Sequence, residues 1–197
     1  MWYIRKIDPL DLIQGHACIA FTGGGGKTSF IELLARRTAA RNKKTASVTT
    51  TKMYARKPFL LFNELTASMN VSNPIQIGNT LEDGKITALT QDSIKEIGNG
   101  FDVVLIEADG ANKKPLKYPA RHEPVIPDFC GMVCVLAGLD GLLGDVRTKI
   151  FRFELLNNEA NISVDAVVSP DLFSQLFTGR GLLKGTENKI FFIVLNK

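Results

Sequence analysis

The sequence is poor in cysteine, and this limits the kinds of site it can build. Its 197 residues include only Cys18, Cys130 and Cys134. An odd number of thiols beside apolar segments excludes a disulfide framework and favours reduced, buried side chains. Three residues separate Cys130 from Cys134 and no second pair exists, so the spacing of a zinc knuckle is absent.

Long apolar runs and long runs of one charge are also missing. No segment approaches the about 20 apolar residues that a membrane span needs, and the N-terminus lacks the apolar core of a signal peptide. The net charge is +4, but lysine and arginine do not gather in one run, and few aromatic residues accompany them. The sequence therefore predicts a cytoplasmic protein that binds neither membranes nor nucleic acid.

The most informative stretch is a run of four glycines followed by Lys27, Thr28 and Ser29. It lies between an apolar segment over 17–20 and a segment of helical periodicity, which is the setting of a phosphate-binding loop. Glycine lets backbone N–H groups form a nest for phosphate oxygens, and the helix N-terminus adds partial positive charge. We expect the loop to bind a nucleoside triphosphate through Gly23, Gly24, Gly25, Gly26, Lys27, Thr28 and Ser29.

Individual residues of this loop have expected roles. Lys27 is expected to be partly exposed, to reach the β- and γ-phosphates and to act in catalysis, while the Thr28 hydroxyl binds Mg²⁺. The general motif has glycine where this chain has Phe21. The spacing resembles the Gly-Lys-Gly-Gly-x-Gly-Lys-Thr variant of dimeric NTPases. In this chain Thr22 stands where that variant has its first lysine. A plain flexible turn is the alternative, and the strand–helix setting disfavours it.

Strand-like and helical segments alternate along the chain. This pattern predicts an α/β fold with a doubly wound, mainly parallel sheet of the P-loop NTPase type and a small β-hairpin insertion. We expect one domain over residues 1–197, truncated at its C-terminus. The expected strands lie near 17–20, 45–51, 102–106, 132–137 and 189–195, and we expect the last one to be central. Helices are expected over 28–41, 92–97 and 169–177. A hairpin is expected to join 75–77 to 85–89 through Asp83-Gly84.

An acidic segment follows the apolar run at 102–106. Glu107 and Asp109 come at the end of this predicted strand, where a parallel sheet brings them beside the glycine loop. Carboxylates suit Mg²⁺, so we expect a metal site of Thr28, Glu107 and Asp109, with Asp109 also acting in catalysis. Gly110 is expected to offer its N–H to the γ-phosphate. An ordinary turn at Asp109-Gly110 is the alternative.

Several motifs together resemble the YqeC family, and they span nearly the whole chain. They are the stretches 23–28, 49–53, 107–111, 115–117, 122–127, 181–185 and 195–197. The resemblance implies an accessory protein for selenium-dependent molybdenum hydroxylases, similar to nucleotide-dependent maturation factors such as nickel-insertion GTPases. Its expected partners are the client hydroxylase or its maturation proteins. The family would have His-Arg where this chain has Phe151-Arg152.

The choice between ATP and GTP depends on the last residues. Guanine-specific P-loop proteins often end a late strand with Asn-Lys-x-Asp, and Asn196-Lys197 follows an apolar strand here. We therefore expect Asn196 to bind the nucleotide, and we favour GTP over ATP.

Three functions are consistent with these residues. The first is a Mg²⁺-dependent, nucleotide-hydrolysing maturation factor, with a homodimer left open. The second is a P-loop kinase or nucleotidyltransferase that acts on a small anionic substrate, with the Thr49–Met53 segment as its acceptor pocket. The third is a module that binds a nucleotide without hydrolysing it.

Overall fold

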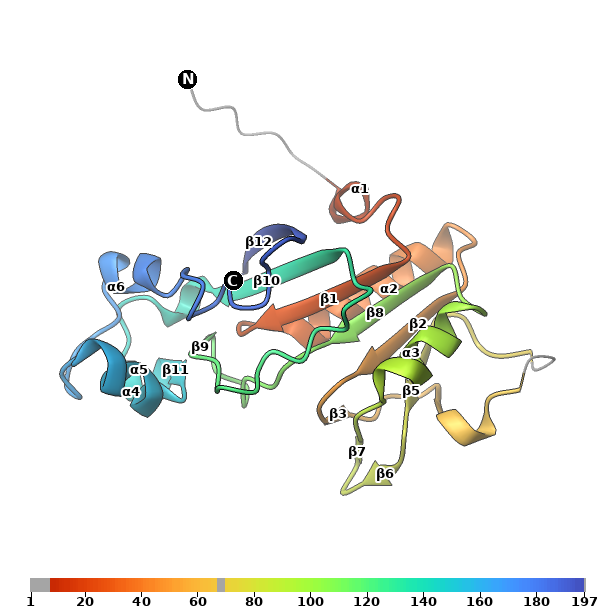
Figure 1. Cartoon of the computed structure of the whole chain (residues 1–197), viewed down its shortest axis with the longest axis horizontal. Coiled ribbons are helices and arrows are strands. Elements are labelled where there is room, and N and C mark those ends of the chain that lie inside the picture. The colour runs from red at the N-terminus through yellow and green to blue at the C-terminus, as the bar shows by residue number, and fades with distance from the viewer. Residues whose placement is uncertain (1–7, 67–69, 197) are drawn as a thin grey trace.

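A computed structural model describes residues 8–66 and 70–196 (Figure 1). Its centre is a seven-stranded sheet of order β12-β10-β1-β8-β2-β5-β4, and every pair of neighbouring strands is parallel. The strands are β1 (Cys18–Gly23), β2 (Thr45–Thr49), β4 (Phe59–Leu61), β5 (Ile75–Gly78), β8 (Val103–Glu107), β10 (Met132–Gly138) and β12 (Ile190–Asn196).

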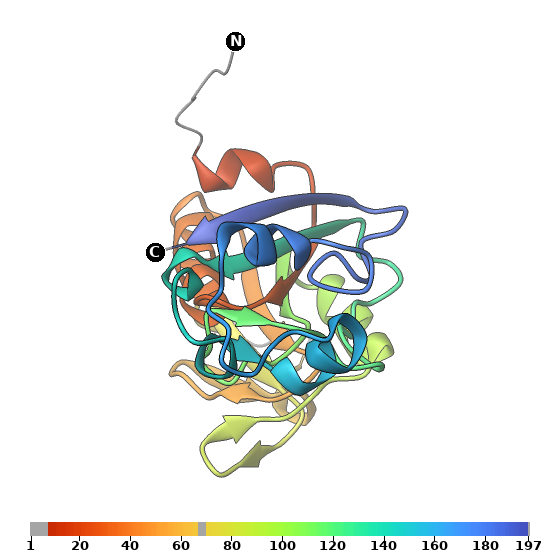
Figure 2. The same ribbon diagram turned by 90° about the vertical axis from the view of Figure 1, so that its left-hand side faces the viewer.

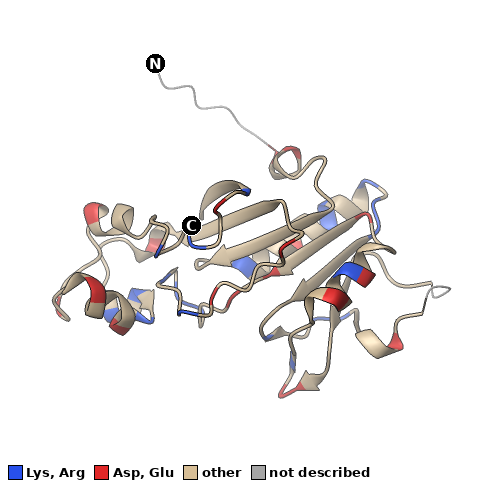
Figure 3. Ribbon diagram, viewed as in Figure 1, with Lys and Arg blue, Asp and Glu red and all other residues tan. Residues whose placement is uncertain are grey.

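The large sheet is almost free of charge. Figure 3 shows charged residues at strand ends, on helices and in loops. All seven residues of β10 are buried, as expected for a strand covered on both faces. Among the described residues of the seven strands, Glu107 is the only charged one. A carboxylate at the end of a buried strand needs a partner, so its position is informative.

Helices cover both faces of the sheet, as a doubly wound fold requires. Ile19 and Phe21 of β1 pack on the side of α2 (Lys27–Ala40) and the short α1 (Pro9–Leu12), whereas Ala20 faces the side of α3 (Gln91–Gly98). The helical stripe predicted for residues 28–41 is confirmed. Its buried residues are Ile31, Leu34, Ala35 and Thr38.

Two smaller sheets flank the large one. β9 (Leu116–Lys117) pairs in parallel with β11 (Ile150–Phe151), next to α4 (Val146–Lys149), α5 (Phe153–Ala160) and α6 (Pro170–Gln175); Figure 2 looks onto this end. β3 (Met53–Tyr54), β7 (Lys85–Ile86) and β6 (Leu81–Glu82) form an antiparallel sheet. Single turns of 3-10 helix cover Phe62–Glu64 (η1) and Leu139–Gly141 (η2).

The α/β fold with a parallel sheet is confirmed, and two local predictions need correction. Asp83-Gly84 does turn a hairpin, but its first arm is Leu81–Glu82. The stretch predicted as that arm is instead β5 of the large sheet, since it pairs with β2 and β4. All four of its residues are buried. Strand β12 lies at the edge of the sheet rather than at its centre, and Ile190 is 59% exposed.

The helix predictions differ from the structure only in detail. Thr90, not Asp92, caps α3 by accepting a hydrogen bond from the Ser93 N–H at 3.1 Å. Ser169 caps α6 and Pro170 is its first residue, as predicted.

The expected burial of the thiols holds in full for two of the three. Cys130 and Cys134 are buried, Cys18 is half-buried, and all three are free. Within the described ranges no helix has the length and apolar character to cross a membrane. The prediction that the N-terminus has no signal peptide concerns residues that lie mostly outside those ranges. Lys197 also lies outside them.

Core packing explains why Phe21 stands where the general loop motif has glycine. Its ring is fully buried and meets the Phe30 ring edge-on at 6.2 Å between centroids. We expect Phe21→Ala to lower the free energy of unfolding by about 3–5 kcal/mol, since the cavity left behind adds to the lost transfer energy. Urea denaturation measures this. Phe129→Ala is the control: this ring is 41% exposed, so its loss should cost about 0.5 kcal/mol or less. Equal effects of the two variants would contradict a core role for Phe21.

Candidate functional site

The glycine loop connects the end of β1 to the start of α2, and its backbone packs directly against other backbone. Gly23 and Gly25 have φ values of +89° and +72°, which side chains rarely tolerate. A Cβ on Gly23 would lie 2.1 Å from the Leu136 carbonyl oxygen, and one on Gly25 would lie 2.3 Å from the Gly138 nitrogen. Glycine is therefore required at both positions by packing as well as by conformation.

Three N–H groups of the loop do not form the phosphate nest that the sequence predicts. The N–H groups of Gly23, Gly24 and Gly25 donate to the Asp109 carboxylate (3.0 Å), the Leu136 carbonyl (2.9 Å) and the Lys114 carbonyl (3.2 Å). Since these donors are used inside the protein, an anion would meet the start of α2, which has no side-chain cap. A helix leaves its first four N–H groups without intrahelical acceptors. Here they belong to Gly26, Lys27, Thr28 and Ser29.

The prediction that Lys27 is partly exposed is wrong. Its side chain is buried, its Nζ lies 2.9 Å from Asp109 Oδ1, and it donates to the Gly23 carbonyl. A buried ammonium needs such partners because it has left water. Lys27 therefore lies at the start of α2, directly after the four glycines, and is paired with Asp109.

A chain of buried charges extends from Asp109. Lys117 Nζ lies 3.0 Å from Asp109 Oδ2 and 2.7 Å from Glu123 Oε2, and it donates to the Gly110 carbonyl at 2.7 Å. Arg152 also pairs with Glu123. Burial acts to raise the pKa of Glu123, but the hydrogen bonds from Arg152 and Lys117 outweigh it and hold that pKa below its usual value. Each of these charged groups therefore has an oppositely charged partner.

Glu107 meets Thr28 as the parallel sheet predicts. Glu107 Oε2 accepts a hydrogen bond from Thr28 Oγ1 at 2.8 Å, although 79 positions separate the two residues. Burial raises the pKa of Glu107, while the charge of Lys27 and the bond from Thr28 partly oppose that rise. The carboxylate is thus desolvated, and a bound cation would offset the cost of keeping its charge away from water.

The oxygen atoms of Thr28 and Glu107 fit Mg²⁺, which prefers hard oxygen ligands. In residues 8–66 and 70–196 no group of three His, Cys, Asp or Glu side chains could hold a metal. Magnesium usually takes few protein ligands and completes its shell with water and phosphate, so the pair is sufficient. Asp109 faces Lys27 and Lys117 instead. Its part in the metal site stays a prediction.

A cavity of about 430 Å³ opens over the loop and the start of α2. Its cationic side chains outnumber its two carboxylates, Glu107 and Asp140, so it attracts anions. We call it the loop cavity. The cations that line it are Lys27, Lys52, Arg56, Lys85, Lys113 and Lys114.

The two remaining predicted residues also lie at the loop cavity or its wall. Gly110 lines the cavity. Asn196 Nδ2 donates to the Gly25 carbonyl at 2.7 Å, so its side chain lies on the glycine loop. Contact between Asn196 and a purine base stays a prediction. Thr22 is buried within β1 and does not face the cavity as the lysine of the variant motif would have to do.

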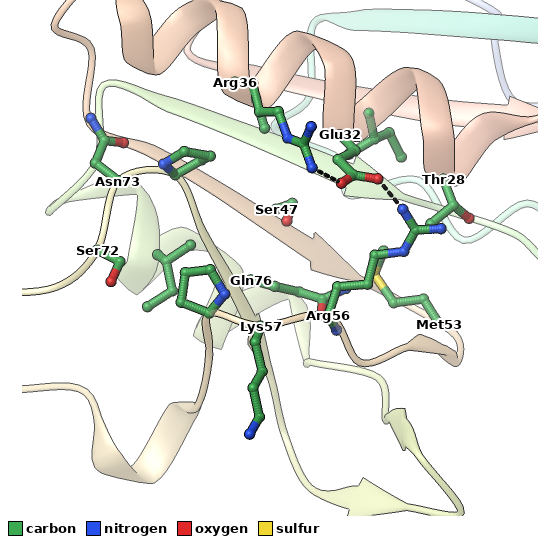
Figure 4. A pocket seen from close by; sticks show the side chains of 15 residues that line it. Thr28, Glu32, Arg36, Ser47, Met53, Arg56, Lys57, Ser72, Asn73 and Gln76 are labelled. Carbon is green, nitrogen blue, oxygen red and sulfur yellow. Dashed lines mark hydrogen bonds and ion pairs between the residues drawn. The ribbon is translucent and has the colours of Figure 1, made fainter.

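A second cavity of about 250 Å³ adjoins the first (Figure 4). It lies between α2 and the segments around Pro58 and Pro74, and we call it the side cavity. The two cavities share Thr28, Met53 and Arg56. In Figure 4, Glu32 lies between Arg36 and Arg56 and pairs with both.

Sequence reasoning missed the parts of the site that depend on tertiary contacts. Arg56 and Lys85 reach the loop cavity from segments without a recognisable motif. Lys52 belongs to the Thr49–Met53 stretch, but nothing in that stretch indicates that its side chain lines this cavity. Lys117 belongs to a short cationic stretch, but nothing in its spacing indicates that it is buried between two carboxylates.

Comparisons with known proteins identify the family to which the chain belongs. The family profile described as YqeC protein matches residues 19–154, which include the glycine loop, Glu107 and Arg152. The uncharacterized protein YqeC of Escherichia coli strain K12 is 31% identical over 131 residues, which are 61% of this chain and 51% of that protein. The chain thus spans about half the length of this relative. No solved structure is significantly similar. Since the profile covers most of the chain, the protein belongs to the YqeC family.

Proposed function

We propose that this protein binds a nucleoside triphosphate with Mg²⁺ and hydrolyses it. The observation that carries the proposal is the joint position of three groups. The uncapped start of α2, the ammonium of Lys27 and the Thr28–Glu107 pair all lie along one cationic cavity. Helix N-termini and lysine stabilise phosphate charge, and a hydroxyl beside a carboxylate suits the metal.

Binding requires Lys27 to leave Asp109 for the phosphate. This exchange costs little, because Asp109 keeps the Gly23 N–H and the ammonium of Lys117. Lys27 in turn exchanges one anionic partner for another. Asp109 therefore acts as a positioning residue that holds Lys27 at the loop until the phosphate arrives.

Hydrolysis follows if a water molecule attacks the γ-phosphorus. The new bond joins the water oxygen to phosphorus while the bond to the bridging oxygen breaks, and the diphosphate leaves with that electron pair. Both protons of the water end on the inorganic phosphate, as dihydrogen phosphate. Bound Mg²⁺ would neutralise phosphate charge, and Lys27 and the N–H groups of α2 would hold the same oxygens. We retain GTP ahead of ATP as the expected nucleotide.

Membership of the YqeC family supports a role in maturation. By the family resemblance, hydrolysis would time the delivery of a component to a selenium-dependent molybdenum hydroxylase in the cytoplasm. Nucleotide turnover with Mg²⁺, followed by affinity capture of the full-length protein and mass spectrometry of its partners, tests the two parts separately. Binding without turnover would favour the nucleotide-binding module instead.

The side cavity favours one further alternative. It opens beside Thr28, next to the place expected for the phosphates, so it could receive an acceptor for phosphoryl or nucleotidyl transfer. An acceptor-dependent rise in turnover would support this kinase or nucleotidyltransferase function. The residues Thr49–Met53, proposed as the acceptor pocket, contribute Met53 to the wall between the two cavities.

Lys27→Ala is expected to weaken binding of Mg²⁺–triphosphate about 10- to 100-fold, the effect of losing a charge-assisted hydrogen bond. Isothermal titration calorimetry measures the affinity. Lys43→Ala is the control, because Lys43 is exposed and lies outside the loop cavity. Unchanged affinity of a folded Lys27→Ala variant would remove Lys27 from the site.

Glu107→Gln is expected to weaken Mg²⁺-dependent affinity about 10- to 100-fold and yet to stabilise the ligand-free protein at neutral pH. The pKa of Glu107 is raised by burial, so between its unfolded and folded pKa values the folded state binds more protons. Stability then increases as pH falls through that window, and the charged carboxylate is unfavourable above it. The amide can still accept the Thr28 bond.

Thermal unfolding at several pH values, with and without Mg²⁺–triphosphate, checks both parts. The exposed Glu96 on α3 supplies the control Glu96→Gln, which should change neither quantity. A Glu107→Gln variant that is less stable without ligand, yet binds Mg²⁺–triphosphate normally, would make Glu107 a structural residue only.

A further inference from the structure

Arg56 lies where the two cavities meet. It lines the loop cavity together with the glycines, Thr28 and Glu107, and it lines the side cavity as well. Its side chain is 47% exposed, so the guanidinium is accessible to a ligand. No sequence motif marks it.

The backbone holds Arg56 in this place. Its N–H donates to Gln76 Oε1 at 2.7 Å, and Gln76 Nε2 donates to the Tyr54 carbonyl at 3.1 Å. Gln76 belongs to β5, so a buried side chain of the large sheet fixes the segment that carries Arg56. The guanidinium is therefore presented from a supported loop.

Glu32 holds the Arg56 side chain against α2, one helical turn from Thr28. Its carboxylate pairs with Arg56, and it lies one helical turn beyond Thr28 on the same face. Figure 4 shows Arg56 reaching up to Glu32 beside Thr28.

The ion pair between Glu32 and Arg56 can be given up easily. Both side chains are about one-third to one-half exposed, and exposed ion pairs contribute little because water screens them. A phosphate offers arginine two oxygens in the geometry of its fork, whereas Arg56 contacts only Oε2 of Glu32. Glu32 also keeps Arg36 as a partner when Arg56 leaves.

We propose that Arg56 is a catalytic residue that contacts the γ-phosphate and stabilises the charge that develops as the bond to the bridging oxygen breaks. The inference rests on the proposed triphosphate hydrolysis and adds a residue to it. Arginine in this position acts chiefly in the transition state. Its loss should therefore slow turnover far more than it weakens binding.

Glu32 provides a matched pair of variants, because it binds two arginines of which only Arg56 lines the loop cavity. Arg56→Gln should lower kcat about 10³-fold or more and change the Kd for Mg²⁺–GTP less than about tenfold. Arg36→Gln loses the same kind of ion pair and should keep kcat and Kd within about twofold of the wild type. Arg56→Lys keeps the charge without the fork and should recover only part of the rate.

The measurements are single-turnover hydrolysis of Mg²⁺–GTP and of Mg²⁺–ATP, with calorimetric Kd and thermal midpoints for each variant. An active wild type with equal rates for Arg56→Gln and Arg36→Gln would overturn the role of Arg56 alone. A rise in Kd without a fall in kcat would also overturn it, since Arg56 would then serve binding. Absence of hydrolysis by the wild type would reject the proposed function and this role together.

Discussion

The carboxylate of Asp109 accepts a hydrogen bond from the Gly23 N–H and pairs with the ammonium groups of Lys27 and Lys117. These three partners come from the end of β1, the start of α2 and strand β9, so one buried group joins the parts that form the site. Without it, two buried ammonium groups would lose a counter-charge, a defect that costs about 3–5 kcal/mol. The position of the glycine loop relative to the sheet depends on this interaction.

Most of the fold could be predicted because its signals are local. The stripe of Ile31, Leu34 and Ala35 gives the helix, and the uncharged run of β10 gives a buried strand. The pairing of Ile75–Gly78 could not be predicted, since its alternating residues fit a hairpin arm as well as a strand of the large sheet. Strand β12 is as apolar as a central strand, and only topology places it at the edge.

The site likewise has parts that could be predicted from the sequence and parts that could not. Thr28 and Glu107 could be brought together from sequence, because neighbouring parallel strands end at the same edge of a sheet. The burial of Lys27 could not, since it depends on how the Asp109 side chain turns back toward the loop. Lys117 and Arg152 meet at Glu123 only through the folding of β9 against β11. Long-range charge pairs of this kind leave no periodic pattern in a sequence.

The tight backbone packing at Gly23 and Gly25 matters for how genetic variation in this loop is interpreted. An alanine at either position would clash with the backbone at the end of β10. It would therefore disturb the fold whether or not it affected a ligand contact. Loss of activity in such a variant would reflect a smaller amount of folded protein as readily as a damaged site, because small losses of stability lower abundance in the cell. Variation at the exposed cations of the cavity leaves the backbone unchanged. Cellular abundance is therefore the quantity that separates the two kinds of variant.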